Sequence, residues 1–218
     1  EGEVFSDIIS LEKEGLKANA NVRSINKTKD GMYFISTNMN GVFFYDPNSI
    51  NTITANEGFK EYETINDIKI DKNGSLWAGG IKGIYKIENG IIVDNFNSSN
   101  SNLPINSVLD IEFDNDGSMW LCQNNFITRF NDNKFEDYSH IIKDYKTQVK
   151  DIEFDNDGTM WLGTTIGLGK YKNDSLTIFK ESDGLVRPLS TNGIAAEPCA
   201  VTIGKNNEVI YCTYGSGF

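Results

Sequence analysis

The stretch VKDIEFDNDGTMWLGT, residues 149–164, decides the fold because two near-copies of it come earlier in the chain. The copies are VLDIEFDNDGSMWLCQ at residues 108–123 and INDIKIDKNGSLWAGG at residues 65–80. The tryptophans of the three copies are 43 and 41 residues apart: Trp77, Trp120 and Trp161. A fixed period of this length indicates a repeat architecture.

Two degenerate copies flank the three good ones. Residues 21–41 place Phe34 one period before Trp77, and residues 198–218 place Tyr211 where the next tryptophan belongs. Outer units that differ from the inner ones are typical of repeat proteins, because the end units meet different neighbours. The sequence therefore contains five copies.

Each copy alternates apolar and polar residues with a period of two, on either side of a polar turn that contains glycine. This pattern is typical of a β-hairpin. A third strand follows in GVFFYD, GIYKI and GLGKYK, and a fourth in KFEDYS and SLTIFK. Four short strands in roughly 42 residues predict a blade of a β-propeller. The fold class is therefore all-β, with four-stranded blades over approximate units 21–64, 65–107, 108–147, 148–190 and 191–218.

Residues 3–11, EVFSDIISL, lie where a fourth strand should precede the first full copy. Pairing of this N-terminal strand with the last unit would complete a blade and remove exposed sheet edges. We therefore expect a closed five-bladed propeller that forms a single domain over residues 1–218. The alternative is an incomplete fragment of a larger propeller.

The pattern D-x-D-G-x-hydrophobic-W-hydrophobic-G-T-x-x-G-L, matched almost throughout by residues 149–168, resembles the two-component regulator propeller repeat. The other copies match it less fully, with Ala78 and Gly80 in one and Cys122 and Gln123 in another. This resemblance implies an extracytoplasmic module of a bacterial sensor kinase that helps to detect glycan breakdown products. It also implies a periplasmic or extracellular location. The family's propellers usually have seven blades, two more than the five copies here.

The net charge of −11 narrows the classes of partner. Nucleic-acid binding usually leaves a basic patch, and this chain has only three arginines, Arg23, Arg129 and Arg187. The same argument weighs against heparin-like polyanions and anionic lipid surfaces. Neutral glycans, cations or a basic protein face remain as partners, and the charge is otherwise typical of solubility. No apolar run approaches the roughly 18 residues of a membrane-spanning helix, so no membrane insertion is expected.

The cysteines and the N-terminal residue say little about function. Cys199 and Cys212 fall on the two strands of the last hairpin, where two buried thiols are expected and a cross-strand disulfide is the alternative. Cys122 replaces a repeat glycine and is interpreted as a small buried residue. The sequence starts at Glu1 without an initiator methionine, which we interpret as a processed or trimmed product.

The segment DNDG, at residues 114–117 and 155–158, resembles the start of a calcium loop. An EF-hand loop needs a glutamate at its twelfth position, where this chain has Asn125 and Ile166. We therefore interpret DNDG as a tight hairpin turn. The repeated tryptophans are predicted to pack between blades.

Carboxylates also recur at one position of the first strand of three units, in Asp67, Asp110 and Asp151. Two residues further on stand Lys69, Glu112 and Glu153. First strands line the channel of a propeller, so these side chains are expected to ring it. Buried polar groups need partners, so most of them should bond to backbone amides, hydroxyls or water. A cation in the channel is the alternative.

No enzymatic activity is expected and no cofactor is predicted. The chain has a single histidine, His140, and its sequence offers no Ser/His/Asp or Cys/His arrangement around it. Streptogramin-lyase-like enzymes have a similar DxxGxxW propeller repeat, but that resemblance implies a dependence on histidine that this chain hardly meets.

A non-catalytic binding module remains. In propellers, the turns between the second and third strands and the connections between blades gather at one mouth of the channel, and such loops often carry function. Amide side chains there, together with Tyr214, would suit a neutral oligosaccharide through hydrogen bonds and ring stacking. The alternative is a protein–protein interaction scaffold. The predicted ligand-binding residues at this mouth are Arg23, Asn38, Asn66, Lys82, Asn106, Gln123, Asn124, Lys150, Thr165 and Tyr214.

Overall fold

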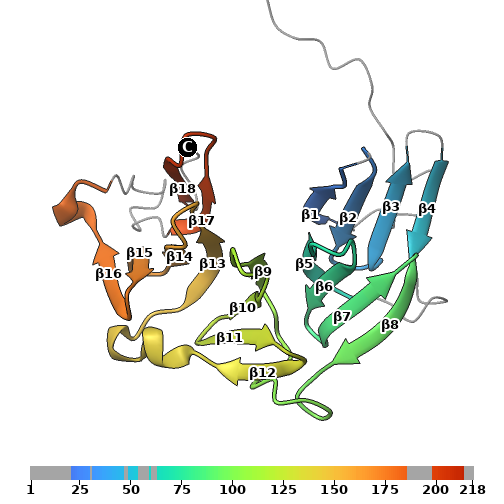
Figure 1. Cartoon of the computed structure of the whole chain (residues 1–218), viewed down its shortest axis with the longest axis horizontal. Coiled ribbons are helices and arrows are strands. Elements are labelled where there is room, and N and C mark those ends of the chain that lie inside the picture. The colour runs from blue at the N-terminus through green and yellow to red at the C-terminus, as the bar shows by residue number, and fades with distance from the viewer. Residues whose placement is uncertain are drawn as a thin grey trace, which may run out of the picture.

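The computed structural model describes residues 21–29, 31–46, 49–53, 59, 63–185 and 198–213. These residues form four four-stranded antiparallel sheets and one two-stranded sheet, each with its strands paired in sequence order. The prediction of an all-β propeller with four-stranded blades is confirmed. Figure 1 shows the sheets following one another in chain order around an arc, with the first strand of each sheet on the inner side.

Blade one consists of β1 (Val22–Lys27), β2 (Tyr33–Thr37), β3 (Val42–Asp46) and β4 (Ser49–Ile53). Blade two consists of β5 (Ile65–Ile70), β6 (Leu76–Gly80), β7 (Gly83–Glu88) and β8 (Ile91–Phe96). Blade three consists of β9 (Asp110–Phe113), β10 (Met119–Gln123), β11 (Phe126–Asn131) and β12 (Lys134–Asp137). Blade four consists of β13 (Val149–Phe154), β14 (Met160–Thr164), β15 (Gly167–Lys172) and β16 (Ser175–Phe179).

The fifth sheet contains β17 (Pro198–Ile203) and β18 (Val209–Thr213). Three short 3-10 turns complete the described elements: η3 (Ser139–Ile141), η4 (Lys143–Tyr145) and η5 (Glu181–Asp183). The predicted strand at residues 3–11, and with it the closure of a five-bladed ring, lies outside the described residues. The number of blades therefore stays a prediction.

The hairpin turns explain the recurring DNDG segment. Asp114 directly follows the first strand of blade three, and its Oδ1 accepts hydrogen bonds from the backbone N–H of Asp116 (3.1 Å) and of Ser118 (2.8 Å). Gly117 follows with φ 86°, in the left-handed region that glycine adopts at little cost. Blade four repeats the arrangement with Asp155 and Gly158. The interpretation of DNDG as a turn is confirmed.

The hydrophobic core lies between consecutive blades. Trp77 of β6 packs against Phe130 of blade three, with ring centroids 5.5 Å apart. Trp120 of β10 likewise packs against Phe154 of blade four, at 5.8 Å. Both indoles are only 6% exposed. The prediction that the repeated tryptophans pack between blades is confirmed for these two residues.

The last hairpin corrects the sequence alignment by one residue. In blade four the register shifts between Val149 and Asp151, and Trp161 pairs with Glu153, two residues after Asp151. The equivalent pair in the fifth sheet is Ile210 with Thr202, so Ile210 and not Tyr211 occupies the tryptophan position. Because side chains alternate across a strand, Tyr211 points to the other face of the sheet. The prediction was wrong because it matched the aromatic Tyr211 to the repeated tryptophan.

The register also bears on the two cysteines of this hairpin. Cys212 pairs with Ala200, and the strand shifts register between Pro198 and Ala200, where Cys199 lies. The side chain of Cys199 is outside the described part of the chain, so the choice between two thiols and a disulfide stays open. Cys122 is fully buried, as predicted, and its Sγ donates to the carbonyl oxygen of Val149 in the next blade.

Candidate functional site

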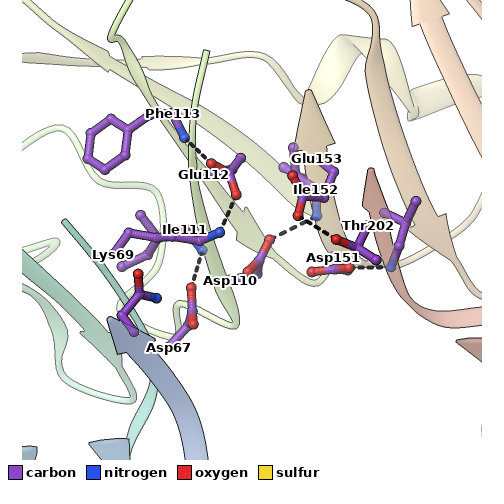
Figure 2. Close-up of polar contacts among 12 residues, drawn as sticks. Asp67, Lys69, Asp110, Ile111, Glu112, Phe113, Asp151, Ile152, Glu153 and Thr202 are labelled. Atoms are coloured by element: carbon purple, nitrogen blue, oxygen red, sulfur yellow. Dashed lines mark hydrogen bonds and ion pairs between the residues drawn. The ribbon is translucent and has the colours of Figure 1, made fainter. Parts of the chain in front are cut away.

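The inner wall of the arc carries the repeated carboxylates, as predicted from the first strands. Figure 2 shows Asp67, Asp110 and Asp151 along this wall, each directed toward the first strand of the following blade. Oδ2 of Asp67 accepts from the backbone N–H of Ile111 (3.1 Å), and Oδ2 of Asp110 accepts from that of Ile152 (2.8 Å). Each bond satisfies an amide at the inner edge of a sheet. The prediction that these carboxylates bond to backbone amides is confirmed.

The third aspartate makes the same contact one blade further on. Asp151 accepts a hydrogen bond from the backbone N–H of Val201, in the fifth sheet. Blade one differs, because Ser24 occupies the equivalent position of β1. There, Nδ2 of Asn26 donates to the carbonyl oxygen of Ile68 (2.7 Å) and ties blade one to blade two. The aspartates of the wall therefore hold consecutive blades together, a structural role.

Burial raises the pKa values of several carboxyl groups in this wall. Burial raises the pKa of Asp110 well above its ordinary value, and the nearby carboxylates of Asp151 and Asp67 add to the effect. Burial likewise raises the pKa of Asp151 to about 6. Burial and the neighbouring carboxylate of Glu112 raise the pKa of Glu153 to about 7.

One cation stands among these acids. Lys69 forms an ion pair with Glu112, which joins the inner strands of blades two and three (Figure 2). Burial alone would lower the pKa of Lys69, but the Glu112 carboxylate raises it above its ordinary value. Within the described residues, no group of three or more His, Cys, Asp or Glu side chains has an arrangement that could hold a metal ion. The charged side chains of the inner wall therefore serve to join neighbouring blades.

Most of the predicted mouth residues make hydrogen bonds within the protein. Gln123 is fully buried, donates to the carbonyl oxygen of Ile105 (2.5 Å) and accepts from Oγ1 of Thr128 (2.7 Å). Nδ2 of Asn66 donates to the carbonyl oxygen of Val108 (2.8 Å). These two amides connect segments of the scaffold.

Two further amides stabilise the connections on which they lie. Oδ1 of Asn38 accepts from the backbone N–H of Asn21 (2.6 Å), and Oδ1 of Asn106 accepts from that of Ser98 (2.7 Å). Arg23 on β1 and Lys82 in the β6–β7 turn are exposed. Tyr214 lies outside the described residues.

The structure brings together three of the predicted residues, Asn124, Lys150 and Thr165, at the junction of blades three and four. Nζ of Lys150 donates to Oδ1 of Asn124 (3.2 Å) and to Oε1 of Gln148 (2.8 Å). Oγ1 of Thr165 accepts from the backbone N–H of Gln148 (3.2 Å) and lies 3.1 Å from Oγ1 of Thr147. This network links the β10–β11 turn, the β12–β13 connection and the β14–β15 turn.

A cavity of about 630 Å³ opens beside this network. One wall is the β10–β11 turn and the other is the connection from β12 to β13, which contains η3 and η4. A volume of this size is typical of small-ligand sites. We call it the junction cavity, and its lining residues are Asn125, Asp137, Ser139, His140, Ile142, Lys143, Lys146 and Thr147.

The walls of the junction cavity are held firmly in place. Tyr138 packs edge-on against Trp120, with ring centroids 4.8 Å apart. Ile141 and Ile142 are buried in the core between blades three and four. The hydroxyl of Tyr145 donates to the carbonyl oxygen of Leu176 on β16 (2.6 Å), which ties the connection to blade four. Figure 1 shows these turns at the periphery, between β12 and blade four. The cavity lies beside Asn124, Lys150 and Thr165, but none of the predicted mouth residues in the described part of the chain is among those that line it.

Sequence reasoning missed the lining residues of the junction cavity. The sequence analysis noted His140 only as the single histidine, and the lysines and hydroxyls around it belong to no motif. Their proximity depends on the two 3-10 turns, which follow no repeat of the sequence. A signal was nevertheless present, since Lys143, Lys146 and Lys150 fall within eight residues, in the connection between β12 and β13 and at the start of β13.

Comparisons with known proteins agree with the fold. No protein-family model and no curated protein matches the sequence. The extracellular domain of a hybrid two-component system from B. thetaiotaomicron has a TM-score of 0.69 at 18% identity, over 90% of this chain and 33% of its own. Virginiamycin B lyase from Staphylococcus aureus has a TM-score of 0.59 at 16% identity, over 88% of this chain and 69% of its own. The WD40 propeller domain of Doa1 has a TM-score of 0.64 at 14% identity, over 90% and 62%.

These similarities establish the propeller fold and leave the ligand undetermined, because the same fold serves many functions. This chain spans about a third of the length of the two-component-system domain. An extracellular domain of a two-component system, a lyase and a WD40 domain all share the fold, so the likeness shows the fold alone.

Proposed function

We propose that this chain is a non-catalytic recognition module that binds an oligosaccharide or another small ligand in the junction cavity. The observation that carries the proposal is a preformed cavity of about 630 Å³ at the blade face where loops gather. Its lining offers hydroxyl, amide and ammonium groups around the apolar side chain of Ile142. Seven of the eight lining residues are polar or charged, which suits a ligand rich in hydrogen-bonding groups such as a saccharide.

The geometry of the cavity argues against hydrolysis, although Asp137, Ser139 and His140 all line it. A catalytic triad needs the serine to bond to the histidine and the histidine to the acid. Here Oγ of Ser139 donates directly to Oδ1 of Asp137 (2.5 Å) and accepts from the backbone N–H of Ile127 (3.2 Å). The ring of His140 lies against Tyr138, with centroids 5.6 Å apart. The histidine therefore neither activates the serine nor bonds to the aspartate.

The location that fits this function is extracytoplasmic, as in the sensor ectodomain that shares the fold. A sensor propeller outside the cytoplasm would meet glycan fragments before any signalling domain does. Across the described residues, the structure has no helix with the length and apolarity needed to cross a membrane.

A protein-interaction scaffold is the second candidate. Ile91 and Val93 on β8, the outer strand of blade two, are 62% and 45% exposed. Val93 is the extra residue of a β-bulge, and both side chains are exposed apolar groups on an edge strand, where another chain can pair. A protein partner could bind there without using the junction cavity.

Thermal unfolding in the presence of a panel of oligosaccharides tests the first candidate. A ligand at about 100 times its Kd should stabilise the fold by about 2.7 kcal/mol. For a chain of this length, that corresponds to a Tm rise of roughly 5–10 °C. We expect Asn125→Ala, which changes an exposed lining residue, to reduce the shift.

Asn102→Ala is the matched control, because Asn102 is exposed in the β8–β9 connection away from the cavity. Its shift should equal that of the unmodified chain. A flat panel would contradict the recognition function and favour the scaffold. In that case Ile91→Lys should abolish binding of a protein partner and leave the Tm nearly unchanged.

A further inference from the structure

Two lysines line the junction cavity, and among the described residues their ammonium groups have no anionic partner. Lys143 and Lys146 both line it, and neither forms an ion pair or a hydrogen bond in the part of the chain described here. Other lysines of the chain do find carboxylates: Lys69 pairs with Glu112, and Lys86 with Glu88. The cavity therefore holds ammonium groups that the fold leaves available.

The backbone of Lys146 gives an independent indication. Lys146 ends η4 with φ 48° and ψ 45°, in the left-handed region. Every other described non-glycine residue with positive φ is an asparagine or an aspartate: Asn89, Asn124, Asp132, Asn133, Asn173, Asp174 and Asn207. Asparagine and glycine adopt this conformation more readily than lysine, and they are the usual residues at such helix ends. A lysine at this position makes the fold less stable than an asparagine or glycine would, and it places an ammonium group at the cavity.

The carboxylate of Asp137 also lines the cavity, but it forms no ion pair with either lysine among the described residues. Its Oδ1 accepts from the backbone N–H (2.8 Å) and Oγ (2.5 Å) of Ser139, so the lining carries two lysines against one carboxylate. Asp144 is exposed on η4 and does not line the cavity. Lys150 adds a third positive charge nearby, and its partners are neutral amides.

Local charge can differ from net charge. At physiological ionic strength, charges separated by more than about 8 Å are largely screened, so the lysines that line the cavity act on a ligand more strongly than distant carboxylates do. A long polyanion would also meet the acidic surface of a chain with net charge −11 and be repelled. A short ligand with one or two anionic groups would meet mainly the lysines.

We propose that the junction cavity binds a short acidic saccharide, whose carboxylate or sulfate group is held by Lys143 and Lys146. The inference rests on the proposed recognition function, because it names the ligand class of the same cavity. It departs from the expectation of a neutral glycan, which followed from the net charge and from the amide side chains at the predicted mouth.

Titration calorimetry with three ligands tests this class: trigalacturonate, its neutral galactose counterpart and a sulfated disaccharide. Binding of trigalacturonate or of the sulfated disaccharide, or of both, should exceed that of the neutral sugar by about tenfold or more, since hydrogen bonds to charged groups are worth that much. The stronger of the two identifies the anionic group. Lys143→Gln and Lys146→Asn should each reduce this binding by about tenfold.

Lys146→Asn has a second readout. Because asparagine suits the left-handed conformation, this variant should unfold at a higher temperature than the unmodified chain while binding the acidic ligand more weakly. Lys172→Gln, which removes an exposed lysine at the end of β15, is the matched control and should change neither property. Opposite changes in stability and affinity would not result from general damage to the fold.

Three results would overturn the proposal, and they can be told apart. Equal binding of the neutral sugar, unaffected by the lysine variants, removes the anionic class and leaves the recognition function standing. Binding of the acidic ligands that weakens equally in Lys172→Gln indicates a nonspecific surface effect. Absence of binding by all three ligands and by the wider panel contradicts both the class and the function.

Discussion

The indole Nε1–H of Trp120 donates a hydrogen bond to Oδ2 of Asp114, at 2.8 Å. The other oxygen of this carboxylate accepts from two backbone amides of the hairpin turn. One aspartate thus holds the turn and fixes the tryptophan of the strand that follows. The same bond recurs between Trp77 and Asp71 and between Trp161 and Asp155, both at 3.0 Å. The six-residue spacing of Asp and Trp in the repeat has this physical cause.

Replacement of Asp114 by alanine should destabilise the protein substantially. The substitution removes acceptors from two backbone amides and from the Trp120 indole, and it removes a charge 3.6 Å from Arg129. With about 1 kcal/mol for each lost hydrogen bond, we expect a loss of about 3 kcal/mol. Thermal unfolding should then show a Tm lower by roughly 6–12 °C.

Asp116→Ala is the control for this prediction, because the side chain of Asp116 is exposed in the same turn. Its Tm should stay close to that of the unmodified chain. Equal losses in the two variants would show that the turn tolerates the loss of its organising carboxylate.

Alanine should be much less tolerated at Gly79 than at Gly163, although the two glycines occupy equivalent repeat positions. A Cβ at Gly79 would lie 2.6 Å from Cγ1 of Val108 in the next blade, and 3.1 Å from Cδ1 of Ile111. At Gly163 the nearest atom would be Cβ of Asp151, at 3.3 Å. Overpacking of a core typically costs about 1–3 kcal/mol, so Gly79→Ala should unfold at clearly lower denaturant concentration. Similar midpoints for the two variants would contradict the close packing of blades two and three.

Stability should fall as the pH rises from about 5 to about 8. The pKa of Glu153 is about 7 and that of Asp151 about 6 in the folded protein, both raised chiefly by burial. In the unfolded chain both return to about 4, so between these values the folded state binds more protons. The contribution of these groups to stability is complete below about pH 4 and is lost as the pH rises through 6 and 7. Denaturant titrations across this range measure the free energy of unfolding directly.

Glu153→Gln should flatten this pH dependence, since the amide does not titrate. Asp155 acts in the opposite direction: against the opposing effect of burial, hydrogen bonds from Trp161 and Thr159 lower its pKa. Its contribution is lost only as the pH falls below about 4, outside the measured range. A slope that Glu153→Gln leaves unchanged would assign the pH dependence to other groups.

Much of the fold could be predicted from the sequence, because each feature depends on local spacing. Alternating residues around a DxxG turn specify a hairpin, and the 43-residue period specifies a blade. The partners of Asp67, Asp110 and Asp151 were also foreseeable, since buried carboxylates on an inner strand need donors. The register of the last hairpin was predicted incorrectly, because the aromatic Tyr211 was matched to the repeated tryptophan. The strand pairing places Ile210 at that position.

The lining residues of the junction cavity could not be predicted from the sequence, and the predicted mouth residues stay a prediction. Amide side chains are common in this chain, and the sequence does not reveal which of them bond within the protein. Gln123 and Asn66 do so, whereas Asn125 lines the junction cavity. The cavity itself depends on two 3-10 turns and on the left-handed conformation of Lys146, neither of which follows the repeat.

The side chains that connect neighbouring blades differ in charge along the array. Three successive joints, from blade two to the fifth sheet, are fastened by acids from the preceding unit, while the joint between blades one and two uses the uncharged amide of Asn26. In a linear array, stability is approximately a sum over such neighbouring contacts. Burial raises the pKa of Asp110 and of Asp151, so a change in pH should alter these two joints and the hydrogen-exchange protection of the Ile152 and Val201 amides that bond to them. The contact of Asn26 with the Ile68 carbonyl oxygen does not titrate.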